Sequence, residues 1–168
     1  PHSIELANRA AEGFVKVYYA AYDSKNRLAD MPQFYRPSSS LVWNGTAFRG
    51  PDGLRDLLSR MPPTTHDVQS HDCQPVPNTS PPQLLVTVTG QVTHGKGPEG
   101  NPKHVRPKEI EGHPRVFHQT FMLVADPEAP VVKPGEVANN CARPWFCRFL
   151  FHLAFPSLCY CSNYPPAD

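Results

Sequence analysis

Apolar residues near the start of the chain recur at the three- and four-residue spacing of an amphipathic helix. Ser3 can cap this helix, whose expected inward stripe consists of Ile4, Ala7, Ala11, Phe14, Tyr18 and Tyr22. A shorter second helix can begin at Asp23 or Ser24 and run to Met31, where Pro32 limits it. This part of the chain therefore predicts two helices, the first with one apolar face.

A hairpin and a third helix are predicted next. Residues 41–43 are strand formers, Asn44-Gly45 is a strong signal for a two-residue turn, and residues 46–49 form the returning strand. A helix then begins at Gly50-Pro51-Asp52 and ends at Pro62-Pro63, and its expected inward residues are Leu54, Leu57, Leu58 and Met61.

The hydrophobic period then changes to two. Strands are predicted over residues 66–76, with breaks at Pro75 and Pro77, and over residues 84–93 and 115–124. The segment between the last two is rich in proline and glycine and is expected to be an irregular loop. Helices followed by long antiparallel strands are typical of an α+β domain whose sheet buries one face against the helices.

Alternation divides the last two strands into two faces. The set expected to meet the helices is Val86, Val88, Gly90, Val92, Phe117, Gln119, Phe121 and Leu123. The opposite set is Thr87, Thr89, Gln91, Thr93, Val116, His118, Thr120 and Met122. This second face is neither strongly hydrophobic nor charged. That composition indicates a protein interface, and a mildly polar, solvent-exposed face is the alternative interpretation.

Composition restricts the class of protein further. A chain of 168 residues fits one domain, and its net charge of +1 gives no global attraction to nucleic acid or acidic membrane. We expect an intracellular protein, because neither a signal peptide nor a membrane-spanning apolar run is visible.

The cysteines form no C-x-x-C pair, so reduced thiols are favoured over a structural zinc site. His66 and His71 are expected to be exposed strand residues, not metal ligands.

Four segments, taken in order, carry a resemblance to a known family. They are RAAEGFVKVYYAAYDSKNRLADMPQFY, SSLVWNGTAFRG, THDVQSHDCQPVP and VFHQTFMLVAD. They resemble the nuclear transport factor 2-like family, and within it the small partner subunits of TAP-type mRNA export receptors. The resemblance covers residues 5–132 and implies an α+β cone, in which a bent antiparallel sheet packs on three helices.

The resemblance also implies a function and a binding face. The function is that of a small non-catalytic subunit, without cofactor or metal, in a heterodimeric mRNA export receptor that shuttles between nucleus and cytoplasm and passes the nuclear pore on Phe-Gly nucleoporins. The implied partner-binding residues are Thr87, Thr89, Gln91, His118, Thr120 and Met122. Asp67, Gln69, His71 and Cys73 are expected to flank them on the same face.

Two other functions are open. A sister subfamily homodimerises and imports Ran-GDP, but its acidic residue after the strand tryptophan is Asn44 here, and its acidic pair falls near residues 95–97, where no carboxylate lies. The cone also hosts isomerases and dehydratases. In that case Asp72, which alternation places inside the cone, is the candidate base, and Tyr18 or Tyr22 the proton donor. A hydrogen-bonded polar cluster at the cone mouth is the favoured alternative.

Two segments depart from this pattern. The loop 94–115 has a modest excess of Lys and Arg and is either a solvated loop, which we favour, or a contact for RNA phosphates. We place the domain at residues 1–138 and an atypical cysteine- and aromatic-rich tail at residues 139–168. In the family the last strand carries an arginine that meets an acidic residue of the receptor, and Arg148 is its candidate here. The tail is an unusual strand or helix, or, as we favour, an aberrant sequence that lacks the last strand, leaving an unpaired sheet edge.

Overall fold

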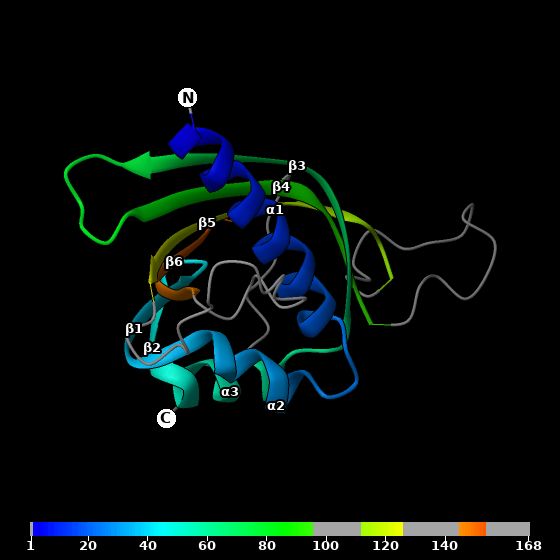
Figure 1. The fold of residues 1–168 in the computed structure, drawn as a ribbon. Coiled ribbons are helices and arrows are strands. Elements are labelled where there is room, and N and C mark those ends of the chain that lie inside the picture. The colour runs from blue at the N-terminus through cyan, green and yellow to red at the C-terminus, as the bar shows by residue number, and fades with distance from the viewer. Residues whose placement is uncertain (1, 96–111, 126–144, 154–168) are drawn as a thin grey trace.

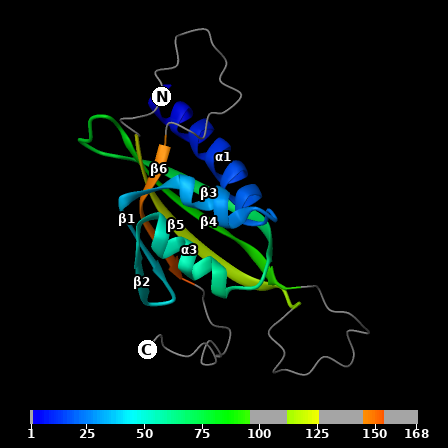
Figure 2. The ribbon, with the colours of Figure 1, turned by 90° about the horizontal axis from the view of Figure 1, so that it is seen from below.

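The computed structural model describes residues 2–95, 112–125 and 145–153, the last of these as backbone only. Its elements are α1 (His2–Tyr22), α2 (Arg27–Asp30), the 3-10 turn η1 (Met31–Phe34), β1 (Tyr35–Trp43), β2 (Thr46–Arg49), α3 (Gly50–Arg60), β3 (Thr64–Val76), β4 (Gln83–His94), β5 (Arg115–Ala125) and β6 (Trp145–Leu153). The predicted order of helices, hairpin, helix and long strands is confirmed. Figures 1 and 2 show the sheet curving around the helices, so that α1 and α3 lie on its concave side.

Helix α1 supplies one wall of the core. The predicted stripe is buried from Ala7 to Tyr22, and Val15 and Tyr19 join it because they flank the stripe on the helix surface. Ile4 was expected in the stripe, but its side chain is 55% exposed. Ile4 lies in the first turn of α1.

The hairpin between β1 and β2 forms as the Asn44-Gly45 signal predicts. Both residues have positive φ, 46° and 86°, which matches the twist of the two strands that they join. Trp43 pairs with Thr46 directly before and after this turn. Gly50, at φ 63°, then starts α3, whose Leu54, Leu57 and Leu58 are buried.

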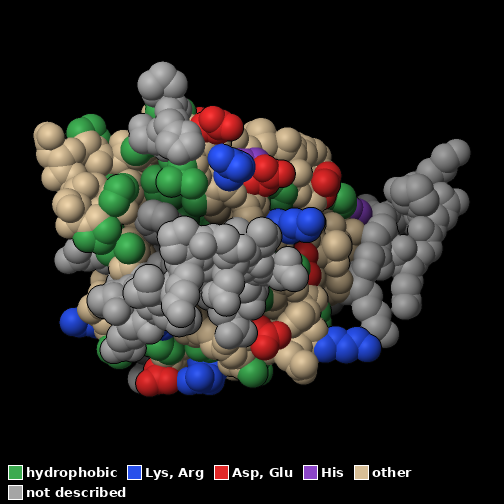
Figure 3. All heavy atoms as spheres, viewed as in Figure 1, with side chains coloured by type: hydrophobic (Ala, Val, Ile, Leu, Met, Phe, Trp, Pro, Cys, Tyr) green, Lys and Arg blue, Asp and Glu red, His purple; other side chains and the backbone are tan. Residues whose placement is uncertain are grey.

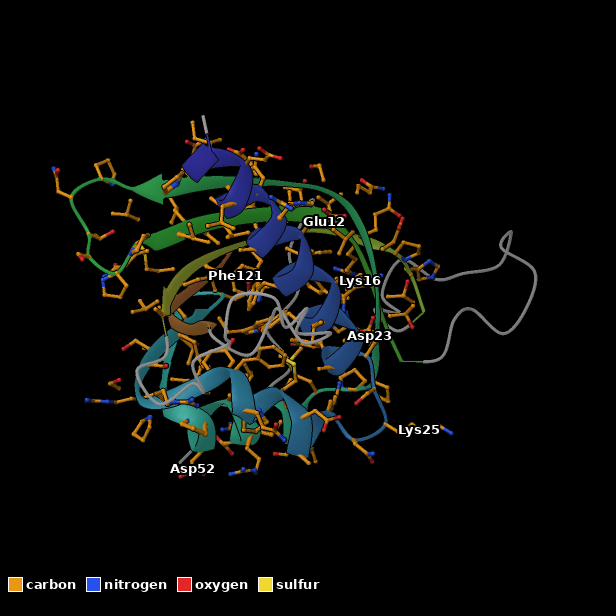
Figure 4. The ribbon with its side chains drawn as sticks, in the orientation of Figure 1. Glu12, Lys16, Asp23, Lys25, Asp52 and Phe121 are labelled. Carbon is orange, nitrogen blue, oxygen red and sulfur yellow. The ribbon has the colours of Figure 1, made fainter. Side chains whose placement is uncertain are left out.

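The strands form a single six-stranded sheet in the order β2-β1-β6-β5-β4-β3. All neighbours are antiparallel except β1 and β6, which run parallel. The inward sets predicted for β4 and β5 are buried, including the polar Gln119 at 2% exposure. Phe121, one of them, lies between the sheet and α1 (Figure 4) and makes an edge contact with the ring of Tyr18 at 4.8 Å.

The tail takes part in this sheet. Residues 145–153 form β6 between β1 and β5, pairing Phe149 with Ser40 on one side and with Met122 on the other. The interpretation of the tail as an aberrant sequence predicted that the last strand of the sheet would be missing, but β6 forms a strand there. This strand lies beyond the domain boundary expected at residue 138.

A β-bulge divides β3 into two halves with opposite facing. Val68 pairs with Gly90 and Ser70 with Thr89, so Gln69 is the extra residue. Before the bulge, the even-numbered residues share the inner face with Val68; after it, the odd-numbered residues do, and Cys73 is buried opposite Val86. Because side chains alternate with a period of two, one inserted residue inverts every position that follows. The strand continues through Pro75 to Val76, and the break predicted there is absent.

A candidate protein-interaction face

The convex face of β3, β4 and β5 carries the predicted partner-binding residues in a regular lattice, which we call the outer face. Cross-strand pairs join Thr87 to Thr120 and Thr89 to His118, and the next pairs along are Leu85 with Met122 and Gln91 with Val116. The six residues named for β4 and β5 thus lie together on the side of the sheet opposite the helices.

The outer face is uncharged on β4 and β5 and partly apolar. Val116 is 56% exposed and Leu85 38%, while the threonines, Gln91, His118 and Met122 are half-buried by their neighbours. Hydroxyl groups tie adjacent strands together: Ser70 Oγ and Thr89 Oγ1 are 2.7 Å apart. This bond contributes to the pairing of β3 with β4, and the uncharged surface of β4 and β5 beside it is one that another protein can cover without desolvating charge.

The charges of this face lie on the edge strand β3. Asp67 pairs with Gln91 and Asp72 with Thr87, so the register places both aspartates on the outer face, and both are exposed. Among the described residues, the outer-face positions of β3, β4 and β5 carry no lysine or arginine. On the helix side, by contrast, Figure 3 shows acidic and basic side chains scattered over the described surface.

Because of the bulge, two residues of β3 that were predicted to flank the outer face do not lie on it. His71 pairs with Val88 and Cys73 with Val86, which assigns both to the inner-face register instead of beside Thr87 and Thr89. Cys73 is buried, and its Sγ lies 3.6 Å from the carbonyl oxygen of Ala7. Burial, with the nearby Asp72 carboxylate, raises the pKa of the Cys73 thiol to about 11, which keeps the thiol protonated at neutral pH. His71 remains exposed, and Gln69 is the bulge residue itself.

Two other predicted contacts lie in parts that the structure does not describe fully. Arg148 lies in β6 at a register shift, between the pairs that Cys147 and Phe149 make with β5, and its side chain is outside the described residues. Most of the basic loop, residues 96–111, is also outside them.

The inside of the cone contains a buried polar cluster. Tyr18 Oη and Tyr35 Oη are 2.8 Å apart, and Tyr19 Oη donates to Gln119 Oε1 at 2.6 Å. Gln119 Nε2 in turn donates to the Tyr18 oxygen at 3.4 Å. All four side chains are buried, so the hydrogen bonds among them satisfy polar groups that would otherwise be costly to bury.

The candidate catalytic base does not lie in this interior. Asp72 was predicted inside the cone, but the bulge turns it to the outer face, where it is exposed. A half-buried carboxylate, that of Asp23, lies directly after α1 and accepts hydrogen bonds from the His66 backbone nitrogen at 2.7 Å and from Thr64 Oγ1 at 2.9 Å. His66 was expected to be exposed, but its side chain is only 4% exposed, with Nδ1 2.6 Å from Asp23 Oδ1.

In the described part of the chain, no three His, Cys, Asp or Glu side chains lie close enough to hold a metal ion. The described helices include none with the length and apolar character needed to cross a membrane.

A scan against protein-family models identifies the chain. The model of the Nuclear transport factor 2 (NTF2) domain matches residues 10–130. The chain belongs to the NTF2 domain family. It is homologous to NTF2-related export protein 1 of Bos taurus, with 33% identity over 84% of this chain and 91% of the relative. NTF2-related export protein 2 of Homo sapiens is 31% identical over 83% of this chain and 88% of the relative.

Solved structures of NTF2 domains show the same fold. A chain from the structure of the Chaetomium thermophilum Mex67 NTF2-like domain complexed with Mtr2 has a TM-score of 0.64 and 17% identity, over 89% of this chain and 98% of that chain. Nuclear transport factor 2 from Cryptosporidium parvum has a TM-score of 0.60 and 22% identity, over 87% of this chain and 92% of that chain. The α+β NTF2-like cone predicted from the sequence is therefore confirmed.

Sequence reasoning missed two features of this NTF2 domain. The acidic edge of the outer face was missed because simple alternation in β3 places Asp67 and Asp72 on opposite faces. The pairing of Asp23 with His66 was missed because the two residues are distant in sequence. One signal pointed to the bulge: Gly90 in the middle of an otherwise apolar and threonine-rich strand, since a strand glycine often marks a bulge or a close backbone approach.

Proposed function

We propose that this chain is the small, non-catalytic subunit of a heterodimeric nuclear mRNA export receptor and binds the large subunit through its outer face. The observation that carries the proposal is the homology to NTF2-related export proteins over 84% of this chain and 91% of the relative. The solved Mex67 NTF2-like domain complexed with Mtr2, similar in fold, is an assembly of this general kind. The uncharged outer face supports the same proposal, because it can be covered at little desolvation cost.

The cone interior supports a non-catalytic role. The tyrosine hydroxyls there hydrogen-bond to one another and to Gln119, and the half-buried Asp23 carboxylate after α1 is held by His66 and Thr64. Groups committed to each other in this way stabilise the fold and are poorly placed to move a proton to or from a ligand. Asp72 lies outside the cone.

The proposal includes passage through the nuclear pore on Phe-Gly nucleoporins, with the subunit moving between nucleus and cytoplasm. The resemblance of the four sequence segments to export subunits supports this part. Contact between the loop 94–115 and RNA is a weaker extension, supported by the excess of Lys and Arg in that loop.

Arginine substitutions on the outer face test the proposal. Thr89→Arg and Thr120→Arg each place a long cationic side chain in the neutral centre of the face, where it would hold a covering partner away from the sheet or have to be desolvated beneath it. We expect each to weaken binding to the NTF2-like domain of a TAP-type large receptor by about a hundredfold or more. Isothermal titration calorimetry measures the change.

The matched control is Thr46→Arg on β2, because Thr46 is an exposed strand threonine outside the outer face. It should leave the affinity within about twofold of the unsubstituted chain. Recovery of Ran-GDP from nuclear extract without any large receptor would contradict the proposal and favour the import function.

A further inference from the structure

The outer face is asymmetric in charge. Across β4 and β5 it presents threonine, glutamine, histidine and apolar side chains, and its acidic groups Asp67 and Asp72 lie on the edge strand β3. The bulge creates this arrangement. The two aspartates are an odd number of positions apart, 67 and 72, and would face opposite sides of a regular strand, but the extra residue Gln69 brings them to the same side.

The register also fixes their separation. Asp67 pairs with Gln91 and Asp72 with Thr87, four residues apart on β4. At the usual rise along a strand, the two carboxylates are about 13 Å apart in the strand direction. Ser70, hydrogen-bonded to Thr89, lies between them, so two single negative charges border a neutral centre.

Neither carboxylate is neutralised within the described part of the chain. The ion pairs found there are Arg9–Glu5, Arg55–Asp52, Arg60–Asp56 and His66–Asp23, and none includes Asp67 or Asp72. Gln74 Nε2 lies 3.4 Å from Asp72 Oδ2, which is a weak neutral contact. Both aspartates are exposed and therefore available to a cation of another molecule.

The outer face of one copy of this chain is poorly complementary to the outer face of a second copy. A symmetric dimer uses the same patch on both subunits, so the patch must complement itself. Two copies would bring four carboxylates to the interface, and the outer-face positions of β3, β4 and β5, all of them described, offer no lysine or arginine to pair with them. Covering an unpaired carboxylate costs free energy, so self-association that stacks β3, β4 and β5 of one copy on the same strands of another is disfavoured.

We infer that the outer face binds a different protein domain, one that presents a neutral centre and two lysine or arginine side chains opposite Asp67 and Asp72. This inference rests on the proposed function, because it takes the large export receptor as the occupant. The two carboxylates act as specificity determinants: they favour a partner with matching cations and disfavour a second copy of this chain.

Salt dependence and neutralising variants test the inference. The complex of the full chain with the NTF2-like domain of a TAP-type receptor is titrated at about 50 mM and about 500 mM salt, because exposed charge pairs are screened over this range. For the double variant Asp67→Asn/Asp72→Asn we expect about tenfold weaker binding at low salt, a loss that largely disappears at high salt. The reversal Asp67→Lys/Asp72→Lys should weaken binding at low salt by about a hundredfold.

A matched control removes the same charge elsewhere. Glu12→Gln/Asp52→Asn neutralises two exposed carboxylates on α1 and α3, on the helix side of the molecule (Figure 4). Its affinity should stay within about twofold at both salt concentrations. Far-UV circular dichroism and the melting temperature of each variant show that the fold is intact.

The outcomes separate the inference from the proposed function. If the unsubstituted chain binds the receptor and the Asp67/Asp72 variants bind equally well at both salts, the inference is overturned and the proposed function stands. If the unsubstituted chain does not bind the receptor, the proposed function fails and the inference with it. A stable homodimer that Thr89→Arg dissociates, seen by light scattering of the chain alone, also overturns the inference.

Discussion

At the scale of single residues, Asp23 joins the end of α1 to the start of β3. Its carboxylate accepts hydrogen bonds from the His66 backbone and from Thr64, and the His66 ring is packed among Tyr19, Tyr22 and Phe117 with centroid distances of 4.8 to 5.2 Å. Burial alone raises the pKa of Asp23, but the hydrogen bonds and charge of His66, together with Thr64, outweigh it. The pKa of the carboxyl therefore lies below its usual value of 3.8.

This depressed pKa predicts acid sensitivity. Below about pH 5 the Asp23 carboxyl, whose pKa is higher in the unfolded chain, binds protons more readily there than in the folded chain. Its contribution to the free energy of unfolding is therefore complete above about pH 5 and is lost as the pH falls through 3.8 and below. Asp23→Asn should reduce the free energy of unfolding at neutral pH by roughly 1–3 kcal/mol and flatten its fall between about pH 5 and 3. Urea unfolding at a series of pH values measures both effects.

The comparison variant is Glu12→Gln, since Glu12 is an exposed carboxylate on α1 and takes part in none of the ion pairs found among the described residues. It should keep the full pH dependence. Equal slopes for Asp23→Asn and the unsubstituted chain would show that this carboxyl is not the group responsible.

The sequence predicts which face of the sheet a residue of a regular strand lies on, but it does not predict which distant polar residue will be its hydrogen-bond partner. Gln119 was placed on the helix-facing side because alternation places it between Phe117 and Phe121, and it is buried there. Its partner Tyr19 lies 100 positions away, and nothing in the local pattern links a tyrosine on a helix to a glutamine on a distant strand. Hydrogen-bond partners of this kind depend on the three-dimensional packing alone.

At the scale of elements, the bulge in β3 depends on Gly90. A Cβ atom added to Gly90 would lie 2.1 Å from the carbonyl oxygen of Asp67 and 3.0 Å from Phe117 Cε1, so the bulged backbone or the ring must move. We expect Gly90→Ala to lower the free energy of unfolding by about 2–4 kcal/mol. Chemical denaturation measures this change.

The same substitution at Gly53 is the control, because Gly53 lies in α3 and its added Cβ would meet the Phe48 Cβ atom at 3.3 Å and the Phe48 backbone only at ordinary contact distances of 3.5 and 3.7 Å. Alanine is favoured over glycine in a helix by about 1 kcal/mol, which offsets a small adjustment of Phe48. A Gly90→Ala chain as stable as the Gly53→Ala chain would mean that the bulge tolerates a side chain.

The regular elements were predictable, and the irregular ones were not, for a physical reason. The period of hydrophobic residues fixes a face only while the backbone stays regular, as in β4 and β5. In β3 a single extra residue inverted the facing, so Asp72 and Cys73 were each assigned to the wrong side. In β6 apolar and polar residues do not alternate, so the sequence alone did not distinguish a strand from a helix there.

At the scale of the whole molecule, one curved sheet has two unlike faces. The concave face is filled by α1, α3 and the buried rings, and it accounts for the stability of the isolated chain. The convex outer face adds little to that stability, because its side chains stay half-exposed when the chain is alone. Folding and partner binding therefore depend on largely separate sets of residues.

This separation predicts how melting temperature responds to the partner. A partner that binds only the folded chain adds about 2.7 kcal/mol when its free concentration is a hundred times its Kd, which raises the Tm of a domain of this size by roughly 5–10 °C. Thr120→Arg should abolish the rise while leaving the Tm of the chain alone within about 2 °C, because Thr120 lies on the outer face and not in the core. Gly90→Ala should do the reverse, lowering the Tm of the chain alone while a rise with partner remains. Differential scanning calorimetry with and without the receptor domain separates the two, and a Thr120→Arg chain that melts much earlier by itself would show that the two faces are coupled.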